Sequence, residues 1–263
     1  MLIAANGTTL NCAIDGLEGK PWLTFSNSLA TDLGMWAPQV EAFKDDYHIL
    51  RYDTRGHGGS DVPPGPYDPT MMAGDVIGLW DALGVATSHF VGLSMGGVIG
   101  LALALDHPRR VTSLCVCDSR ANSHPVHMER WAARNKGAVE HGMAWLAADF
   151  TGHWFTPAAH AAKHPWIEPV RRMVEATDLQ GYLAGVNVVT GVDFRPRLAE
   201  LRVPTLSLAG AQDIGDFPDQ AKAMHAAVPG SHLALIEGAA HLCNLEKPES
   251  FNAAIAAHLA RAA

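Results

Sequence analysis

The pentapeptide from Gly92 to Gly96 is the part of this chain whose residue types and spacing point most directly to chemistry. It places Ser94 between two glycines, in the pattern Gly-x-Ser-x-Gly. The apolar run Phe90-Val91 precedes it and a small-residue helical pattern from Gly97 to Asp106 follows, which is the strand–turn–helix context of a nucleophile elbow. In such a turn the serine backbone is strained, and its hydroxyl lies at the positive end of a helix. We therefore predict Ser94 as a nucleophile, with a chance glycine-rich turn as the alternative.

A serine nucleophile needs a base that takes its proton and an acid that orients the base. In one recurring arrangement the acid and then the histidine follow the serine along the chain, each on a loop after a parallel strand. Asp213 follows the apolar run from Thr205 to Ala209, and His241 follows the run from His232 to Ile236. Because the carboxyl ends of parallel strands meet at one edge of a sheet, we predict that Asp213 and His241 complete a triad with Ser94.

Other acids and histidines remain as alternatives to these two. Asp216 lies three residues beyond Asp213 on a loop that Gly215 makes adaptable, and Asp118 follows the strand after the pentapeptide as a weaker candidate acid. We predict structural roles for three histidines that fall in helix or strand patterns: His225, His232 and His258.

The negative charge that develops on a substrate carbonyl needs fixed N–H donors. The residue after the nucleophile, Met95, is expected to supply one of them. The loop after the strand from Trp22 to Phe25 is expected to supply the other. By position we assign it to the backbone N–H of Leu29, with Ser28 as the neighbouring possibility.

The elements that must position these residues alternate between short β-like runs and helical patterns. Helical spacing is clearest in the segments 69–83, 97–106 and 251–259. Alternation of this kind predicts an α/β fold with a mainly parallel central sheet covered by helices on both faces. The runs predicted as strands are Leu10 to Ile14, Trp22 to Phe25, Tyr47 to Tyr52, His89 to Val91, Val111 to Val116, Thr205 to Ala209 and His232 to Ile236.

The middle of the chain has helical patterns and no convincing strand. We therefore predict a core domain formed by residues 1–121 and 196–263, with a helical cap, residues 122–195, inserted into it. The apolar inner face of such a cap would shape a pocket; the alternative is that its tryptophans only pack helices together. The tryptophans concerned are Trp131, Trp145, Trp154 and Trp166.

A second dense motif runs from Tyr52 to Ser60 and is rich in glycine. It lacks the Gly-Lys-Ser/Thr ending of a phosphate-binding P-loop and the full Gly-x-Gly-x-x-Gly fingerprint. Charged side chains beside a tight turn usually brace neighbouring loops, so we predict structural roles for Asp53 and Arg55.

Composition excludes several classes of function. The 263 residues are 48% hydrophobic and 17% charged with a net charge of −8, which favours a folded domain and argues against nucleic-acid or anionic-membrane partners. The start of the chain shows no signal-peptide pattern, so we expect a cytoplasmic protein. Four cysteines and fourteen histidines form no metal-ligand spacing, so we predict buried thiols and no metal site.

Six stretches together resemble a known family. Three of them resemble the α/β-hydrolase superfamily: residues 51–58, 92–97 and 238–241. Three more resemble the 3-oxoadipate enol-lactonases of the β-ketoadipate pathway: residues 27–36, 62–67 and 154–157. The resemblance implies an α/β-hydrolase fold and a cofactor-free serine hydrolase that opens a small enol-lactone in aromatic catabolism. The segments 177–187 and 211–216 depart from the family's pattern, which leaves the exact substrate open.

The implied substrate carries a carboxylate, so the pocket should hold a cation for it. Among the cap's cations we select Arg134, because it follows Trp131 by three residues and shares its helix face. Trp36 and Trp154 lie in the stretches that resemble the lactonases, and we expect them to contact substrate as well. The other cap cations considered are Lys136, Arg171 and Arg172.

Several functions compete with the lactonase. A broad carboxylesterase for small esters, or a cofactor-free perhydrolase or haloperoxidase, would use the same triad. A non-catalytic ligand receptor on the same fold is a further alternative, which the intact set of Ser94, Asp213 and His241 disfavours. We expect a small-molecule lactone or ester as the binding partner, with homo-oligomerisation as a further possibility.

Overall fold

A mostly parallel sheet forms the centre of the computed structural model, which describes residues 1–123 and 125–262. Its order in that part of the chain is β1-β2-β4-β3-β5-β6-β7-β8, in which β1–β2 and β2–β4 pair antiparallel and the other neighbours pair parallel. The predicted fold class is confirmed. The strands are β1 (Leu2–Ala5), β2 (Thr8–Gly16), β3 (Trp22–Ser26), β4 (His48–Tyr52), β5 (Ser88–Leu93), β6 (Val111–Cys117), β7 (Thr205–Gly210) and β8 (His232–Ile236).

Each of the seven runs predicted as strands is a strand, with ends shifted by a few residues. The edge strand β1 was not predicted, because it is only four residues long and Leu2 is 67% exposed, so neither length nor alternating burial marks it. Its pairing with β2 aligns Leu2 with Asn11 and Ala5 with Thr8.

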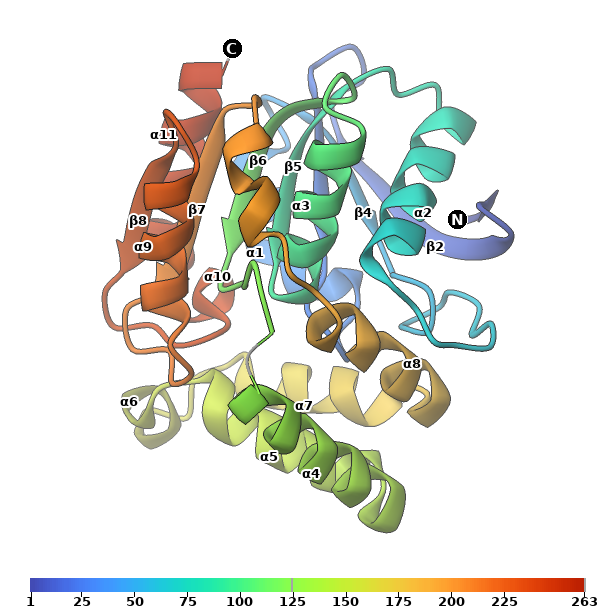
Figure 1. Ribbon diagram of the computed structural model, residues 1–263, viewed down its shortest axis with the longest axis vertical. Coiled ribbons are helices and arrows are strands. Elements are labelled where there is room, and N and C mark those ends of the chain that lie inside the picture. Colours follow the sequence, from blue (N-terminus) through green and yellow to red (C-terminus); the bar gives the residue numbers. More distant parts are fainter. Residues whose placement is uncertain (124, 263) are drawn as a thin grey trace.

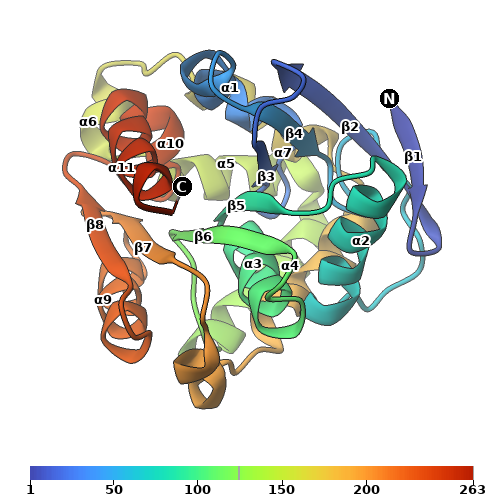
Figure 2. The same ribbon diagram turned by 90° about the horizontal axis from the view of Figure 1, so that it is seen from above.

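Helices cover both faces of the sheet (Figure 2). One face carries α2 (Pro69–Ala82), α3 (Met95–Asp106) and α9 (Phe217–Ala227), and the other carries α1 (Ala37–Phe43), α10 (Cys243–Glu246) and α11 (Pro248–Ala262). Two 3-10 helices, η1 (Leu33–Trp36) and η2 (Arg195–Glu200), join elements. The core fills both helix–sheet layers, and its largest fully buried side chains include Trp36, Trp80, Tyr52, Phe25 and Phe90.

Local signals set the ends of the helices. Asp68 caps α2 by accepting a hydrogen bond from the N–H of Met71 at 2.8 Å, and Pro69 occupies the first turn, where its missing N–H costs nothing. Gly84 follows this helix with a φ of +69°, a conformation that glycine adopts readily. Every residue of α3 from Met95 to Ala104 is buried, which explains its continuous apolar composition.

Among the described residues, five α-helices lie between β6 and β7 and cover the carboxyl edge of the parallel strands (Figure 1). The segment leaves and rejoins the core side by side, because Asn122 pairs with Asp193 in an isolated bridge and the N–H of Phe194 donates to Ala121 O at 2.7 Å. The helices are α4 (Pro125–His141), α5 (Met143–Trp154), α6 (Pro157–Ala161), α7 (Ile167–Ala176) and α8 (Leu179–Thr190). We refer to them together as the cap.

The glycine-rich motif after β4 braces loops. The carboxylate of Asp53 accepts the backbone N–H of Leu33 at 2.7 Å and that of Gly59 at 2.8 Å. Arg55 forms a buried ion pair with Asp75 on α2. These contacts explain the acidic and basic side chains of this motif without a ligand.

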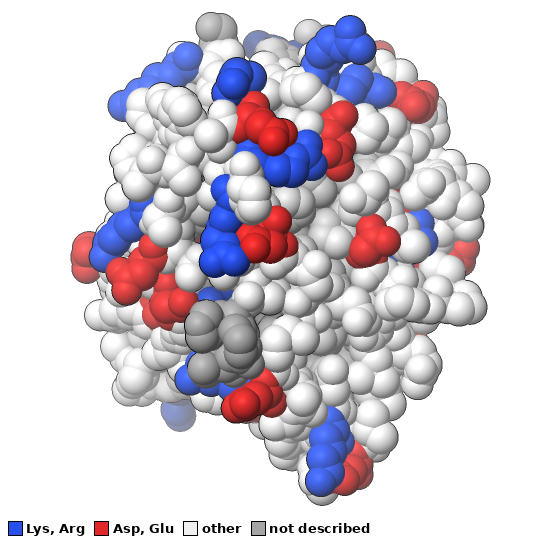
Figure 3. Space-filling model, viewed as in Figure 1, with Lys and Arg blue, Asp and Glu red and all other residues white. Residues whose placement is uncertain are grey.

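The remaining features concern the cysteines, the surface charge and the character of the helices. All four cysteines are buried free thiols, as predicted. On the face shown in Figure 3, basic and acidic side chains lie interspersed rather than in one charged field. Within the described residues, no helix has the length and apolar character needed to cross a membrane.

Candidate active site

The turn between β5 and α3 holds Ser94 in a backbone conformation that side-chain-bearing residues rarely adopt. Its φ is +55° and its ψ is −110°, which places strain at this one residue. The flanking glycines are required sterically, because a Cβ on Gly92 would overlap the carbonyl of Gly96, and a Cβ on Gly96 would overlap the carbonyl of Ser26. The pentapeptide thus forms the elbow that its spacing indicates, with Ser94 at the N-terminus of α3.

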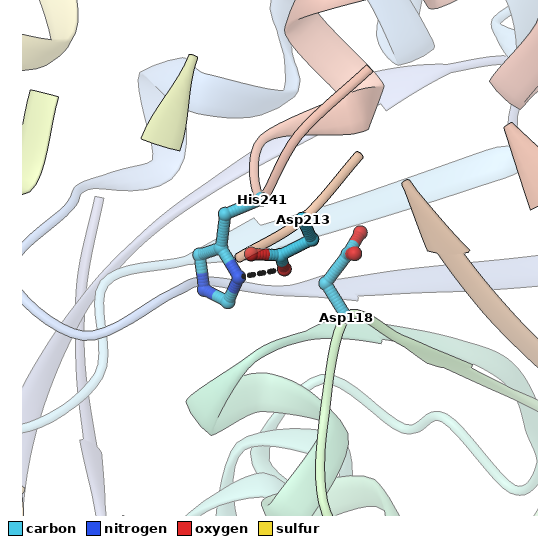
Figure 4. Close-up of side chains that lie close together, drawn as sticks. All are labelled: Asp118, Asp213 and His241. Carbon is cyan, nitrogen blue, oxygen red and sulfur yellow. Dashed lines mark hydrogen bonds and ion pairs between the residues drawn. The ribbon is translucent and has the colours of Figure 1, made fainter. Parts of the chain in front are cut away.

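Asp213 and His241 meet across the carboxyl edge of the sheet. Asp213 lies three residues after β7 and His241 lies five residues after β8. The Nδ1 of His241 lies 2.7 Å from Oδ2 of Asp213, and both side chains are buried (Figure 4). The rings of Trp154 and Phe217 flank the imidazole, with centroids 5.9 Å and 4.7 Å away. This hydrogen bond fixes the ring so that its other nitrogen faces away from the acid.

Asp216 and the rival histidines make contacts other than with His241. Asp216 pairs through Oδ1 with Nη1 of Arg120 at 2.5 Å. The imidazole of His225 bonds to the hydroxyl of Ser231, and His232 and His258 pack edge to face. The geometry therefore joins Asp213, not Asp216, to His241.

The backbone N–H groups of Met95 and Leu29, predicted as oxyanion donors, have no acceptor of their own: within the described residues, neither donates to a protein acceptor. The neighbouring N–H of Ser28 does so, to Sδ of Met35 at 3.4 Å, which favours Leu29 over Ser28. The loop is held against α3 because the N–H of Gly96 donates to Asn27 O at 3.0 Å.

Ser94, Asp213 and His241 line one cavity of about 1120 Å³ between the core and the cap. Its core side includes Ser28, Leu29 and Val98. The cap contributes an aromatic wall, formed by Trp131, Trp145, Phe150 and Trp154. Three of the four cap tryptophans thus line the cavity, and Trp166 does not. Trp154 also packs inside the cap, where the ring of Phe150 stacks on it at 4.5 Å.

Three arginines also line this cavity: Arg120, Arg130 and Arg134. The Nε of Arg134 donates to Oδ2 of Asp149 at 2.8 Å, and its guanidinium lies 5.4 Å from the ring centroid of Trp131 and 5.3 Å from that of Phe150. Arg134 and Trp131 therefore share a helix face, as their spacing indicates. The other cap cations considered form ion pairs along their own helices and do not line the cavity. Lys136 pairs with Glu140, and Arg171 and Arg172 both pair with Glu168.

The prediction that Trp36 contacts substrate is wrong. Trp36 is fully buried in the core, where its ring stacks on Phe25 at 4.7 Å and it does not line the cavity. Its Nε1 donates to Oδ1 of Asn27 at 2.9 Å. Trp36 therefore supports the loop that carries Leu29 and does not contact the substrate site. The sequence cannot separate the two roles, because a buried aromatic residue and a pocket-lining one produce the same pattern.

Asp118 lies directly behind the acid and is more important than its weak sequence signal suggests. Burial, and then the neighbouring charge of Asp213, raise the pKa of Asp118 well above its usual range. The ligand atoms of Asp118, Asp213 and His241 lie within 4.8 Å of one another, so their types alone would permit a metal ion. The oxygens of Asp118 instead accept hydrogen bonds from Gly210 and Cys243, and His241 bonds to Asp213, so the three satisfy one another within the protein.

Comparison with known proteins gives the family. The alpha/beta hydrolase family model matches residues 21–254. This chain belongs to the alpha/beta hydrolase family. The match spans the elbow, both loops of the acid–base pair and the whole cap, so this hydrolase has its candidate site within the family's common region.

Individual relatives match this hydrolase over nearly its full length. It is 34% identical over 259 residues to 3-oxoadipate enol-lactonase 2 of Acinetobacter baylyi, covering 98% of this chain and 96% of that protein. A putative carbamate hydrolase of Klebsiella pneumoniae is 28% identical over 252 residues, covering 92% of each. The crystal structure of the enol-lactonase from Burkholderia xenovorans superposes with a TM-score of 0.94 at 36% identity, covering 99% of this chain and 100% of that one.

Proposed function

We propose that this protein is a serine hydrolase that opens a small lactone, with 3-oxoadipate enol-lactone converted to 3-oxoadipate as the best-supported reaction. The observation that carries the proposal is the convergence of strained Ser94 and the hydrogen-bonded pair Asp213–His241 on one cavity. Similarity to the named enol-lactonases supports the choice of substrate.

The reaction is a two-step acyl transfer. His241 takes the proton of Ser94 as Oγ attacks the lactone carbonyl, and Asp213 holds the imidazole in the required tautomer and stabilises its positive charge. The carbon–oxygen bond of the ring then breaks, and the leaving enolate takes the proton back from His241 and becomes a ketone, which returns the imidazole to its neutral form. Because this leaving group stays tethered to the acyl part, it remains in the site until a water activated by His241 attacks the acyl-enzyme.

The N–H groups of Met95 and Leu29 are proposed as the oxyanion hole. Within residues 1–123 and 125–262 neither donates to a protein acceptor, so neither must break such a bond to receive the developing charge. Donors that are fixed before the reaction stabilise a transition state more than donors that must reorganise.

For the carboxylate of the substrate we propose the cationic part of the cap wall, with Arg134 as the principal partner and Trp154 as an apolar contact. Arg134 is held by Asp149 and by two aromatic rings, so its guanidinium is ordered before substrate binds. An ordered cation loses less conformational entropy on binding than a free one.

The test is the loss of enol-lactone absorbance with purified wild type and Ser94→Ala side by side. Fast decay with the wild type and none with the variant would establish the chemistry together with the substrate class. A fluorophosphonate probe should label the wild type only. Lactone turnover by a clean Ser94→Ala preparation would exclude the mechanism, and failure of the wild type to react with the probe would favour a non-catalytic receptor.

A carboxylesterase with larger ester substrates is the second candidate, and the size of the cavity favours it. Ligand pockets commonly span about 300–1,000 Å³, and the 1120 Å³ here leaves room beyond a small lactone against the aromatic cap wall. The ratio of kcat/KM for the lactone to kcat/KM for p-nitrophenyl esters of increasing acyl length distinguishes the two. A ratio that falls steeply with chain length would favour the esterase.

A further inference from the structure

One buried hydroxyl at the cavity has no hydrogen-bond partner in the protein. Within residues 1–123 and 125–262, the side-chain oxygen of Ser28 is fully buried and bonds to no protein group. The other unpartnered polar atoms in these ranges belong to residues that do not line the cavity, whereas Ser28 lines it together with Ser94 and His241. A buried hydroxyl without a partner weakens a fold, so its place in this cavity points to a group that arrives with the substrate.

The backbone of Ser28 is turned away from the cavity. Its N–H donates to Sδ of Met35 at 3.4 Å, and its carbonyl oxygen accepts the hydroxyl of Thr31 at 2.8 Å and the N–H of Thr31 at 3.3 Å. Met35 and Thr31 are fully buried and do not line the cavity. Because both polar backbone groups of Ser28 are used on that side, its side chain is the part of the residue that remains to face the cavity.

The same contacts set the direction of the neighbouring N–H of Leu29. A trans peptide is planar, so its N–H points opposite to the carbonyl of the preceding residue. The carbonyl of Ser28 points toward Thr31, so the N–H of Leu29 points the other way, toward the cavity that Leu29 also lines. The hydroxyl of Ser28 and the N–H of Leu29 therefore belong to one short stretch of the cavity wall.

The loop that carries Ser28 lies against the N-terminus of α3. The N–H of Gly96 donates to Asn27 O at 3.0 Å, so the residue before Ser28 contacts the elbow directly. The elbow carries the nucleophile and the N–H of Met95, at the helix end that favours negative charge. A serine hydroxyl rotates freely about its carbon–oxygen bond, so its hydrogen can turn toward an anion formed there.

We propose that Ser28 is a catalytic residue whose hydroxyl donates a third hydrogen bond to the substrate oxyanion, beside the N–H groups of Leu29 and Met95. This inference rests on the proposed function and adds a side-chain donor to the two backbone donors. As Oγ of Ser94 attacks, the carbonyl π bond breaks and its electron pair moves to the carbonyl oxygen. The hydroxyl of Ser28 receives that charge without breaking a bond in the protein. Side-chain donors of this kind occur in oxyanion holes together with backbone amides.

The experiment compares the wild type with Ser28→Ala and Ser207→Ala in the hydrolysis of p-nitrophenyl acetate. Ser207, on β7, is a matched control, because its buried hydroxyl also has no partner in the described part of the chain but does not line the cavity. Ser28→Ala should lower kcat by about 100-fold, as removal of one oxyanion donor does, with KM little changed. Ser207→Ala should leave both constants unchanged. Wild-type kinetics in Ser28→Ala would overturn the proposal.

Binding of trifluoroacetone tests the oxyanion directly. Oγ of Ser94 adds to the ketone carbonyl, the serine proton passes to His241 and the carbonyl oxygen becomes an anion, with no group leaving. Because this adduct resembles the transition state, Ser28→Ala should weaken trifluoroacetone binding by about the same 100-fold factor. A fall in kcat without a matching loss of trifluoroacetone affinity would show that the hydroxyl does not contact the oxyanion.

Stability separates this role from a structural one. Removal of a buried hydroxyl that has no partner should leave the urea midpoint of Ser28→Ala unchanged or higher, whereas loss of a hydroxyl that holds the loop together would lower it. A lower midpoint, or a variant that does not fold, would therefore reject the proposal. A wild type that hydrolyses p-nitrophenyl acetate but not the enol-lactone would contradict the proposed substrate and leave this test of Ser28 intact.

Discussion

The three side chains of the proposed triad line one cavity, and each has a different local environment. Ser94 is strained and half-buried, His241 lies between two aromatic rings, and Asp213 is buried against His241 and Asp118. At the residue scale, backbone strain, ring packing and a buried hydrogen bond therefore give the three groups different surroundings. The same reasoning separates Asp213 from Asp216, which is engaged by Arg120 instead.

The two aspartates give a matched test. Asp213→Asn would leave the size of the side chain but favour the wrong tautomer of His241, so kcat should fall by about 10⁴-fold. Asp216→Asn removes an ion pair outside the triad and should change kcat far less. Steady-state kinetics of both variants, with circular dichroism to confirm folding, checks the assignment. Equal losses in the two variants would contradict it.

Arg134 has its own prediction. If its guanidinium receives the substrate carboxylate, Arg134→Ala should raise KM for a carboxylated lactone by about tenfold, the loss of one charge-assisted hydrogen bond. KM for a neutral ester of similar size should change little. Arg172→Ala, on the exposed surface of α7, is the matched control. An unchanged KM for the carboxylated lactone in Arg134→Ala would reject the role.

At the scale of elements, the site is assembled from loops at the carboxyl ends of parallel strands. β3 supplies Leu29, β5 supplies Ser94, β7 supplies Asp213 and β8 supplies His241, so strands far apart in sequence deliver their residues to one edge. The elbow is the tightest of these connections, because α3 must approach both β5 and the loop after β3.

A glycine pair tests how much this close approach matters. Gly96→Ala forces a Cβ against the carbonyl of Ser26, so the free energy of unfolding should fall by about 3 kcal/mol. Gly152→Ala, on the exposed side of α5 with no atom within 4 Å of the added Cβ, should gain about 0.5–1 kcal/mol. Urea unfolding of both variants measures the difference. Similar stabilities would mean that the elbow tolerates rearrangement.

At the scale of the whole molecule, the core holds the three predicted triad residues, and the cap supplies an aromatic cavity wall. The two parts are joined by short connections at Asn122 and Asp193 and by a hydrogen bond from the N–H of Leu242 to Trp154 O at 3.2 Å. That bond links the residue after His241 to the cap wall, so the position of the cap and the position of the base are mechanically connected.

Global stability should depend on pH through a buried histidine. Burial, and then the charges of His232 and His89, lower the pKa of His258 to about 4. The unfolded chain takes up this proton near pH 6.5 while the folded protein does not, so stability is complete above that pH and declines as pH falls toward 4. Between pH 7.5 and pH 5, His258 should therefore account for a loss of about 2 kcal/mol.

His258→Phe checks this by urea unfolding at the two pH values. The variant removes the titrating ring but keeps an aromatic side chain, so its stability should fall less than that of the wild type on acidification. His141→Gln, at an exposed position on α4, should behave as the wild type does. Parallel pH slopes for wild type and His258→Phe would show that other groups dominate.

Much of the fold and the order of the site residues could be predicted from local pattern. Three signals each reflect a constraint that acts over a few residues. They are the glycines around Ser94, the apolar runs that end just before Asp213 and His241, and the absence of strand patterns in the middle of the chain. The edge strand β1 was missed because its constraint is a partner strand rather than its own composition.

Local sequence was enough to identify the candidate triad residues and the strands and helices that carry them, because turn sterics and apolar periodicity act within short segments. Four outcomes were decided only by the tertiary structure. Asp213 is the acid that bonds to His241, and Trp36 belongs to the core. Arg134 pairs with Asp149, and Asp118 lies beside Asp213. These outcomes depend on contacts between residues from 11 positions apart, as in Phe25 and Trp36, to 95 apart, as in Asp118 and Asp213. Burial and charge at such contacts follow from packing in space, which no local pattern records.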